Sequence, residues 1–130
     1  MADALKICVV DDEQIVCERL KPILEKCGFS VETYNEGASA LKRLSETTFD
    51  VLITDIKMGQ PDGIELLGYA QAHSPSTRVI IITGFATAET AREAMKGGAV
   101  DFIAKPFRLS QLTDLVATIA AEIRAARPEA

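Results

Sequence analysis

The chain has 130 residues, the size of one domain, which leaves no room for a catalytic domain with a separate output module. Hydrophobic residues make up 48% and charged residues 25%, so the chain can bury a core and does not resemble a disordered protein. A formal net charge of -5 argues against nonspecific binding to nucleic acid or to an anionic membrane. Its apolar runs are far shorter than the ~20 residues that span a bilayer. One domain over residues 1–130 that folds alone is therefore expected.

The N-terminus and the cysteines favour the cytoplasm. Residues 1–6 lack the basic start and apolar stretch of a secretory signal. Cys8, Cys17 and Cys27 are odd in number and form no C-x-x-C motif, so we expect reduced thiols buried as small hydrophobic groups. His73 is the only histidine and is expected on the surface, not on a transition metal. The protein is therefore predicted to be cytoplasmic.

Strand and helix patterns alternate along the chain. Residues 6–10 are an apolar run that predicts a strand, and apolar residues then recur at helical spacing from Val16 to Cys27, where Gly28 can end a helix. The same unit recurs four more times, with strands at 30–34, 51–54, 79–82 and 101–104 and helices around 41–44, 64–72, 87–96 and 112–123. Because no hairpin signal separates the strands, the pattern predicts an α/β fold, a parallel sheet with helices on both faces.

Local patterns refine this prediction. The second strand alternates polar and apolar residues, which suits a sheet edge, whereas the first, third and fourth are nearly all apolar and suit the centre. Asp62 and Glu65 have the spacing of a capping box, and Gly97-Gly98 can end the fourth helix. That helix offers only small or single apolar side chains for burial: Ala88, Ala91, Ala94 and Met95. Either it is weakly anchored, or the high helix propensity of alanine makes it ordinary.

Polar residues stand where the predicted strands end. Asp11 and Asp12 follow the first strand, Asp55 follows the third, Thr83 the fourth and Lys105 the fifth. In an open parallel sheet ligands bind beyond the carboxyl ends of the strands, so these side chains are expected to converge. Each aspartate alone could equally be a helix cap, but their common position favours one site.

Three carboxylates at one edge imply particular chemistry. They repel one another unless a cation intervenes, and oxygen ligands suit a hard ion such as Mg²⁺, or Mn²⁺ in its place. One carboxylate could then attack phosphorus and form an aspartyl-phosphate. Asp55 is the best candidate nucleophile because Asp11 and Asp12 are adjacent and look like a metal-binding pair. The motifs of P-loop, dinucleotide-binding and esterase sites are missing.

Four segments together resemble the receiver domain of two-component response regulators. They are residues 9–13 (VVDDE), 50–55 (DVLITD), 82–84 (ITG) and 101–107 (DFIAKPF), and their spacing suits that family from Lys6 to about Arg124. The resemblance implies a flavodoxin-like, doubly wound sheet of order 2-1-3-4-5. It further implies a cytoplasmic signalling protein that takes a phosphoryl group from a phosphohistidine of a sensor kinase, as in a phosphorelay, and is not a turnover enzyme.

Site roles follow from the same resemblance. Asp55 would accept the phosphoryl group, and Asp11, Asp12 and Asp55 with the backbone carbonyl of Lys57 would hold Mg²⁺. Thr83 would hydrogen-bond the phosphoryl oxygen, Lys105 would pair with it, and the Lys105-Pro106 peptide would be cis. Thr83 and Phe102 would move together on phosphorylation and reshape the face formed by the fourth helix, the fifth strand and the last helix. Phe102 could also be an ordinary core residue.

Two positions depart from the family pattern or add to it. The family usually has proline directly after Met58, whereas this chain has Gly59 there and proline at Pro61, which predicts a changed turn beside an intact site. Gly84 leaves the phosphoryl site open to a kinase, while the bulky Phe85 is expected to hinder water and slow self-dephosphorylation.

The sequence allows more than one kind of downstream partner for the receiver. The chain is either a stand-alone regulator acting on a protein partner or a piece of a DNA-binding regulator with a fused output domain, because residues 83–90 resemble receivers of nitrogen-regulator-type activators. Residues 125–130 would be a terminus or the first part of a linker. A homodimer formed on phosphorylation is a further option, although Gln111, Asp114, Glu122 and Arg124 suggest a solvated last helix. The alternatives are a pseudo-receiver that is never phosphorylated and a Mg²⁺-dependent phosphohydrolase, which would need an acid where Lys57 stands.

Overall fold

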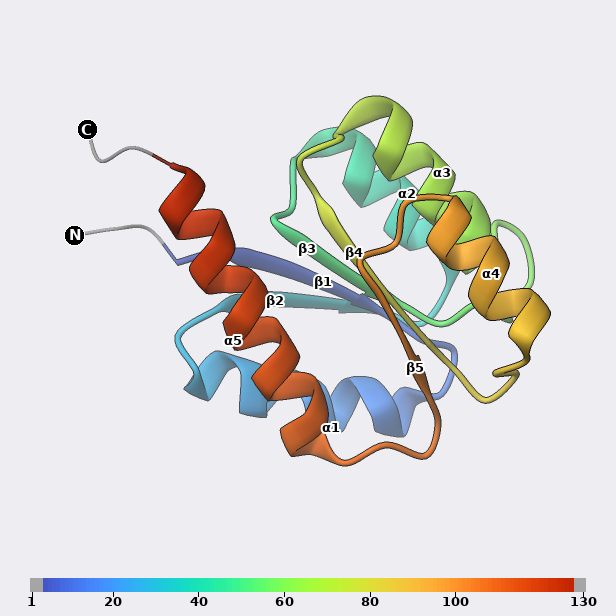
Figure 1. Ribbon diagram of the computed structural model, residues 1–130, viewed down its shortest axis with the longest axis horizontal. Coiled ribbons are helices and arrows are strands. Elements are labelled where there is room, and N and C mark those ends of the chain that lie inside the picture. The colour runs from blue at the N-terminus through green and yellow to red at the C-terminus, as the bar shows by residue number, and fades with distance from the viewer. Residues whose placement is uncertain (1–3, 128–130) are drawn as a thin grey trace.

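The computed structural model describes residues 4–127, which form a three-layer α/β sandwich (Figure 1). All five strands are parallel and lie in the order β2-β1-β3-β4-β5, which confirms the predicted fold class and strand order. The elements, in chain order, are β1 (Lys6–Val10), α1 (Gln14–Lys26), β2 (Ser30–Tyr34), α2 (Gly37–Glu46), β3 (Val51–Thr54), α3 (Gly63–His73), β4 (Arg78–Thr83), α4 (Ala88–Lys96), β5 (Asp101–Ala104) and α5 (Leu109–Ala126).

The boundaries differ from the sequence-based expectation mainly at β4 and α5. Strand β4 is one residue longer at each end than predicted, so that Thr83 is the last strand residue and not the first residue beyond it. Helix α5 continues to Ala126, two residues into the segment expected to be a terminus or linker. The remainder of that expected segment, residues 128–130, lies outside the described residues. Within residues 4–127, no helix is both long and apolar enough to cross a membrane.

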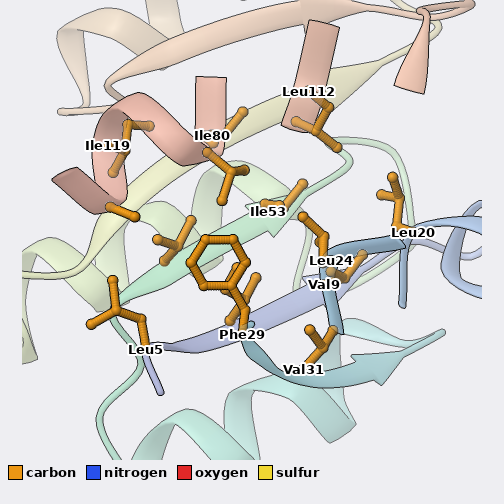
Figure 2. Packing of buried hydrophobic residues seen from close by; sticks show 14 of the residues in the cluster. Leu5, Val9, Leu20, Leu24, Phe29, Val31, Ile53, Ile80, Leu112 and Ile119 are labelled. Atoms are coloured by element: carbon orange, nitrogen blue, oxygen red, sulfur yellow. The ribbon is translucent and has the colours of Figure 1, made fainter. Parts of the chain in front are cut away.

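The sheet buries side chains on both faces, as the apolar central strands require. On one face, residues of β1, β3 and β4 pack against α1 and α5, and Figure 2 shows this cluster with Phe29 and Val31 at its β2 end. On the other face they pack against α2, α3 and α4 (Figure 1). The central strands are fully buried because helices cover them on both sides, and this rigid layer sets the positions of the residues that follow each strand.

The predicted burial of the cysteines and of the apolar side chains of α4 is only partly correct. Cys8 and Cys17 are buried, but Cys27 is exposed, because α1 ends at Lys26 and Cys27 already lies in the turn that Gly28 completes with a φ of +98°. In α4, Ala94 is fully buried, whereas Met95 is 48% exposed and points away from the sheet. With a single buried residue, α4 removes little apolar area from water, which supports the prediction of a weakly anchored helix.

Caps account for where the helices begin. The predicted capping box at α3 is present: Glu65 N donates to Asp62 Oδ1 at 2.9 Å, and Asp62 N donates to a Glu65 carboxylate oxygen at 3.2 Å. Helix α4 has a second box that the sequence analysis missed, in which Thr87 and Thr90 satisfy each other's backbone N–H groups. Threonine at both positions is an uncommon form of the motif, since the residue three after the cap is usually Glu or Gln.

An ion pair fastens α2 to the edge strand β2. Arg43 donates two hydrogen bonds to the carboxylate of Glu32, at 2.8 and 3.1 Å, and Tyr34 donates a third at 2.6 Å. The hydrogen bonds from Arg43 outweigh the opposing effect of burial and hold the pKa of Glu32 at about 2, well below its ordinary value. Because the folded-state pKa is depressed, this contribution to stability is present above the unfolded pKa and is lost as pH falls towards 2.

Replacing Glu32 by glutamine should therefore lower the thermal unfolding midpoint at pH 7 and leave little difference from wild type near pH 2. The matched control is Glu46→Gln, which removes a more exposed carboxylate 3.4 Å from the same Arg43 and should have a smaller effect. Thermal unfolding followed by circular dichroism across this pH range provides the measurement. A Glu32→Gln deficit that persisted unchanged at pH 2 would show that packing, and not the ion pair, is responsible.

Candidate functional site

The register of the strands brings the predicted polar residues to one edge of the sheet. Val10 pairs with Thr54 across β1 and β3, so Asp11 and Asp55, the next residues, emerge side by side. Thr83 pairs with Ala104 across β4 and β5, so Lys105 follows at the same level. The parallel arrangement therefore produces the convergence that the sequence predicted.

Three aspartates form an acidic cluster at this edge. Asp11, Asp12 and Asp55 each offer a carboxylate oxygen, and these oxygens all lie within 4.8 Å of one another. Asp11 is fully buried, Asp55 is 5% exposed and Asp12 is exposed, so the cluster opens to solvent on the Asp12 side. Three hard oxygen donors at this spacing fit a divalent ion such as Mg²⁺.

Lys105 supplies the positive charge at the cluster. Its Nζ lies 2.7 Å from Asp11 Oδ2, 2.7 Å from Glu13 Oε1 and 2.9 Å from Asp55 Oδ2. Burial works to lower the pKa of Lys105, but its contacts with these three negatively charged carboxylates outweigh burial and raise the pKa above its ordinary value. Burial raises the pKa of Asp11, and the bonds from Lys105 and from the backbone of Glu13 offset this only in part. The lysine therefore stays charged, and burial disfavours the ionised form of Asp11.

Backbone contacts fix the two buried aspartates. Glu13 N donates to Asp11 Oδ1 at 2.9 Å, and Ile56 N donates to Asp55 Oδ1 at 2.6 Å. From the end of β2, the Asn35 amide donates to the backbone carbonyl of Asp11 at 2.9 Å, which braces the strand end that carries this carboxylate. The sequence analysis missed Asn35, because nothing in its local pattern indicates that it reaches across to the neighbouring strand.

Glycines bring the loop after β3 close to the site. A Cβ at Gly63 would overlap the carbonyl oxygen of Asp55 and lie 2.8 Å from its carbonyl carbon, so only glycine fits there without movement. Gly59 has a φ of +82°, a conformation that favours glycine, and the Gln60-Pro61 peptide is cis. Gly63 therefore packs directly on the backbone of Asp55, and the changed turn expected from Gly59 and Pro61 stays a prediction.

Thr83 is fully buried, and its hydroxyl accepts a hydrogen bond from Phe85 N at 3.0 Å. The carbonyl of Phe85 in turn accepts one at 2.8 Å from Thr90, the residue of the α4 capping box. A continuous chain of hydrogen bonds thus joins Thr83 to the first turn of α4. The Phe85 ring is 57% exposed, and Lys57 Nζ lies 5.5 Å from its centroid.

The remaining predicted residues lie around this cluster. Phe102 is half-buried and packs against the core on the α2, α3 and α4 face of the sheet. The Lys105-Pro106 peptide is cis, as the resemblance implied. Lys57 is exposed in the loop two residues beyond Asp55, and the ligand role of its carbonyl stays a prediction. His73 is exposed, as predicted.

The sequence analysis also missed Glu13 as part of the site. Glu13 belongs to the acidic run that follows β1, but its contact with Lys105 joins residues 92 positions apart. Its place in the acidic run Asp11-Asp12-Glu13, within the segment that carries the family resemblance, was the signal that could have indicated it.

Comparisons with known proteins agree with this geometry. Residues 7–117 match the family model described as the response regulator receiver domain. The chain is 37% identical over 110 residues to the transcriptional regulatory protein ZraR of Klebsiella oxytoca, covering 85% of this chain and 25% of that protein. It therefore spans about a quarter of the length of this relative.

Two solved structures show the same fold. A CheY-like receiver domain protein from Methanospirillum hungatei JF-1 superposes with a TM-score of 0.87 at 27% identity, covering 95% of this chain and 99% of that chain. A response regulator from Burkholderia pseudomallei, described with a phosphorylated aspartic acid, a calcium ion and citrate, has a TM-score of 0.80 at 28% identity, covering 93% and 71% of the two chains. With its acidic cluster and lysine at the carboxyl edge of a 2-1-3-4-5 sheet, the chain belongs to the response regulator receiver domain family.

Proposed function

We propose that Asp55 accepts a phosphoryl group from a phosphohistidine of a sensor histidine kinase. The observation that carries this proposal is the position of the Asp55 carboxylate, 5% exposed, within the aspartate cluster and 2.9 Å from the Lys105 ammonium. In the transfer, a carboxylate oxygen of Asp55 forms a bond to phosphorus as the bond between phosphorus and the donor histidine nitrogen breaks. The products are an aspartyl-phosphate and a free imidazole, so one transfer changes the state of the protein and is not enzymatic turnover.

The chain's own residues stabilise the charge of the transferred group. Asp11, Asp12 and Asp55, with the carbonyl of Lys57, would hold Mg²⁺ or Mn²⁺, which supplies positive charge to the phosphoryl oxygens when bound. Lys105 pairs with one of these oxygens, and Thr83 donates its hydroxyl to another. Because the Thr83 oxygen accepts a bond from Phe85 N, moving the Thr83 hydroxyl group towards the phosphoryl group would change a contact that leads to α4.

This contact is the route by which we expect the site to act on a partner. Phe102 is half-buried and α4 has one buried residue, so both can move at low cost when Thr83 does. The face formed by α4, β5 and α5 then changes for a downstream protein, a fused output domain or a second copy of the chain. ZraR is four times as long as the matched segment and is a transcriptional regulator, which supports a fused output domain for this chain.

Incubation with acetyl phosphate and Mg²⁺ should add one phosphoryl group to the wild-type chain and none to Asp55→Asn. The intact mass, measured with and without Mg²⁺, is the readout. Asp114→Asn, which removes an exposed carboxylate on α5, is the control and should behave as wild type. If the wild type gains no mass under any condition, the chain is a pseudo-receiver and the proposed function is wrong.

Replacing Phe85 by alanine should shorten the lifetime of the aspartyl-phosphate. The exposed ring lies two residues beyond Thr83 and beside the Lys57 ammonium. Its bulk next to Thr83 is the reason we expect it to hinder the approach of water to Asp55. The loss of the phosphorylated mass after removal of acetyl phosphate gives the half-life. Met95→Ala removes another exposed apolar side chain, which lies on α4, and should leave the half-life unchanged. Equal half-lives for Phe85→Ala and wild type would contradict the shielding role.

A further inference from the structure

Three carboxylates surround the ammonium of Lys105. Lys105 Nζ donates hydrogen bonds to Glu13 Oε1 at 2.7 Å and to Asp55 Oδ2 at 2.9 Å, and Asp11 Oδ2 lies 2.7 Å away as an ion pair without a hydrogen bond. An incoming phosphoryl oxygen must therefore compete with these carboxylates for the ammonium. The ease of phosphorylation therefore depends on which of these contacts breaks.

Glu13 differs from the other two partners in its surroundings. Asp11 and Asp55 are buried and belong to the acidic cluster that fits a divalent ion, whereas the Glu13 side chain is 57% exposed and is not part of that cluster. A bound ion would draw Asp11 and Asp55 to itself, which leaves Glu13 as the remaining carboxylate on Lys105. Glu13 can then turn into solvent at small cost.

The side chain of Glu13 does nothing else in the described structure. Glu13 is the N-cap residue of α1, the position where an acidic side chain often accepts a bond from the helix, yet it makes no such bond. Its backbone is fixed, because Glu13 N donates to Asp11 Oδ1 and its carbonyl accepts from Val16 N. The carboxylate reaches instead to Lys105, 92 residues away.

We propose that Glu13 is a positioning residue that holds Lys105 in the resting arrangement and competes with the phosphoryl group for its ammonium. This inference rests on the proposed function of Asp55 as the acceptor. It makes Glu13 a brake on phosphorylation: the contact stabilises the unphosphorylated site and must be released before Lys105 can pair with a phosphoryl oxygen.

Phosphorylation by acetyl phosphate at fixed Mg²⁺ tests the brake. Glu13→Gln should be phosphorylated about two- to fivefold faster than wild type, the size expected for the loss of one exposed ion pair. Glu13→Asp keeps the charge but is one methylene shorter and should be faster as well, because it no longer reaches Lys105. Glu18→Gln removes the same charge from the exposed surface of α1 and should match wild type. Added salt should narrow the difference, since it screens the exposed pair.

A second measurement needs no phosphorylation. Reductive methylation of the lysines, quantified by peptide mass spectrometry without Mg²⁺, should modify Lys105 severalfold faster in Glu13→Gln and Glu13→Asp, with the exposed Lys42 as internal reference. If Glu13→Gln and Glu13→Asp were both labelled and phosphorylated at the wild-type rates, the proposal would be overturned. A faster Glu13→Gln beside an unchanged Glu13→Asp would also overturn it, because charge alone would then explain the effect. If the wild type takes no phosphoryl group, the proposed function fails while labelling still decides the Glu13 contact.

Discussion

Replacing Gly63 by alanine should lower the free energy of unfolding by about 2–4 kcal/mol, at the upper end of what overpacking costs. A Cβ at this position would overlap the carbonyl oxygen of Asp55 and lie 2.9 Å from the Cα of Ile56. Both are backbone atoms of a buried strand end and cannot move aside as a flexible side chain could. The added methyl group must therefore displace either the start of α3 or Asp55 itself.

Chemical denaturation gives the stability of the Gly63→Ala variant. Gly68→Ala is the matched control, because Gly68 lies in the same helix with nothing within 4 Å of an added Cβ. That change should stabilise the protein by about 0.5–1 kcal/mol through the better helix propensity of alanine. Equal effects of the two substitutions would refute the packing of Gly63 on Asp55. The Gly63→Ala variant should also be phosphorylated more slowly, since Asp55 is shifted.

Replacing Lys105 by methionine should slow phosphorylation by about 10²–10³-fold, the range found when one preorganised charge-stabilising group is removed. The variant keeps a side chain of similar size but leaves Asp11 and Asp55 buried without their cation. Lys42→Met, on the exposed surface of α2, is the control and should retain the wild-type rate. The rate of mass gain with acetyl phosphate is the readout, and a wild-type rate would exclude Lys105 from the chemistry.

The same variant should show a characteristic pH dependence of stability. Burial already raises the pKa of Asp11, and loss of Lys105 raises it further, with Asp12, Glu13 and Asp55 as the remaining charged neighbours. A carboxyl group with a raised folded-state pKa stabilises the fold at low pH and loses that contribution as pH rises through the folded pKa. Lys105→Met should therefore unfold at a lower temperature at pH 8 than at pH 5. This difference in the unfolding midpoint between the two pH values should be larger for the variant than for wild type. Added Mg²⁺ should reduce the difference in the variant, because it replaces the missing positive charge.

The sequence predicted the fold well because its signals were local and repeated. Five apolar runs, each followed by residues at helical spacing, were sufficient for the sheet, the helices and the edge position of β2. The errors lie where exposure depends on where a helix ends or how it is rotated. Cys27 is exposed because α1 stops one residue before it, and Met95 is exposed because α4 turns Ala94, not Met95, towards the sheet.

The candidate site was predictable to the extent that strand ends defined it. Asp11, Asp12, Asp55, Thr83 and Lys105 each follow or end a strand, and the rule for parallel sheets brings such residues together. Glu13 and Asn35 were missed because their contacts with Lys105 and with the Asp11 carbonyl depend on side-chain directions across the sheet edge. Sequence spacing contains no information about those directions.

The lysine at the acidic cluster has a consequence for how the protein matures. In many small metal-binding domains, ion binding supplies the free energy of folding, and a chelator unfolds them. Here the positive charge between Asp11 and Asp55 is part of the polypeptide, since Lys105 contacts both. A newly synthesised chain can thus reach its final shape whatever the local supply of divalent ions. Under the proposed function, a divalent ion would then be needed for phosphoryl transfer to Asp55 and not for folding.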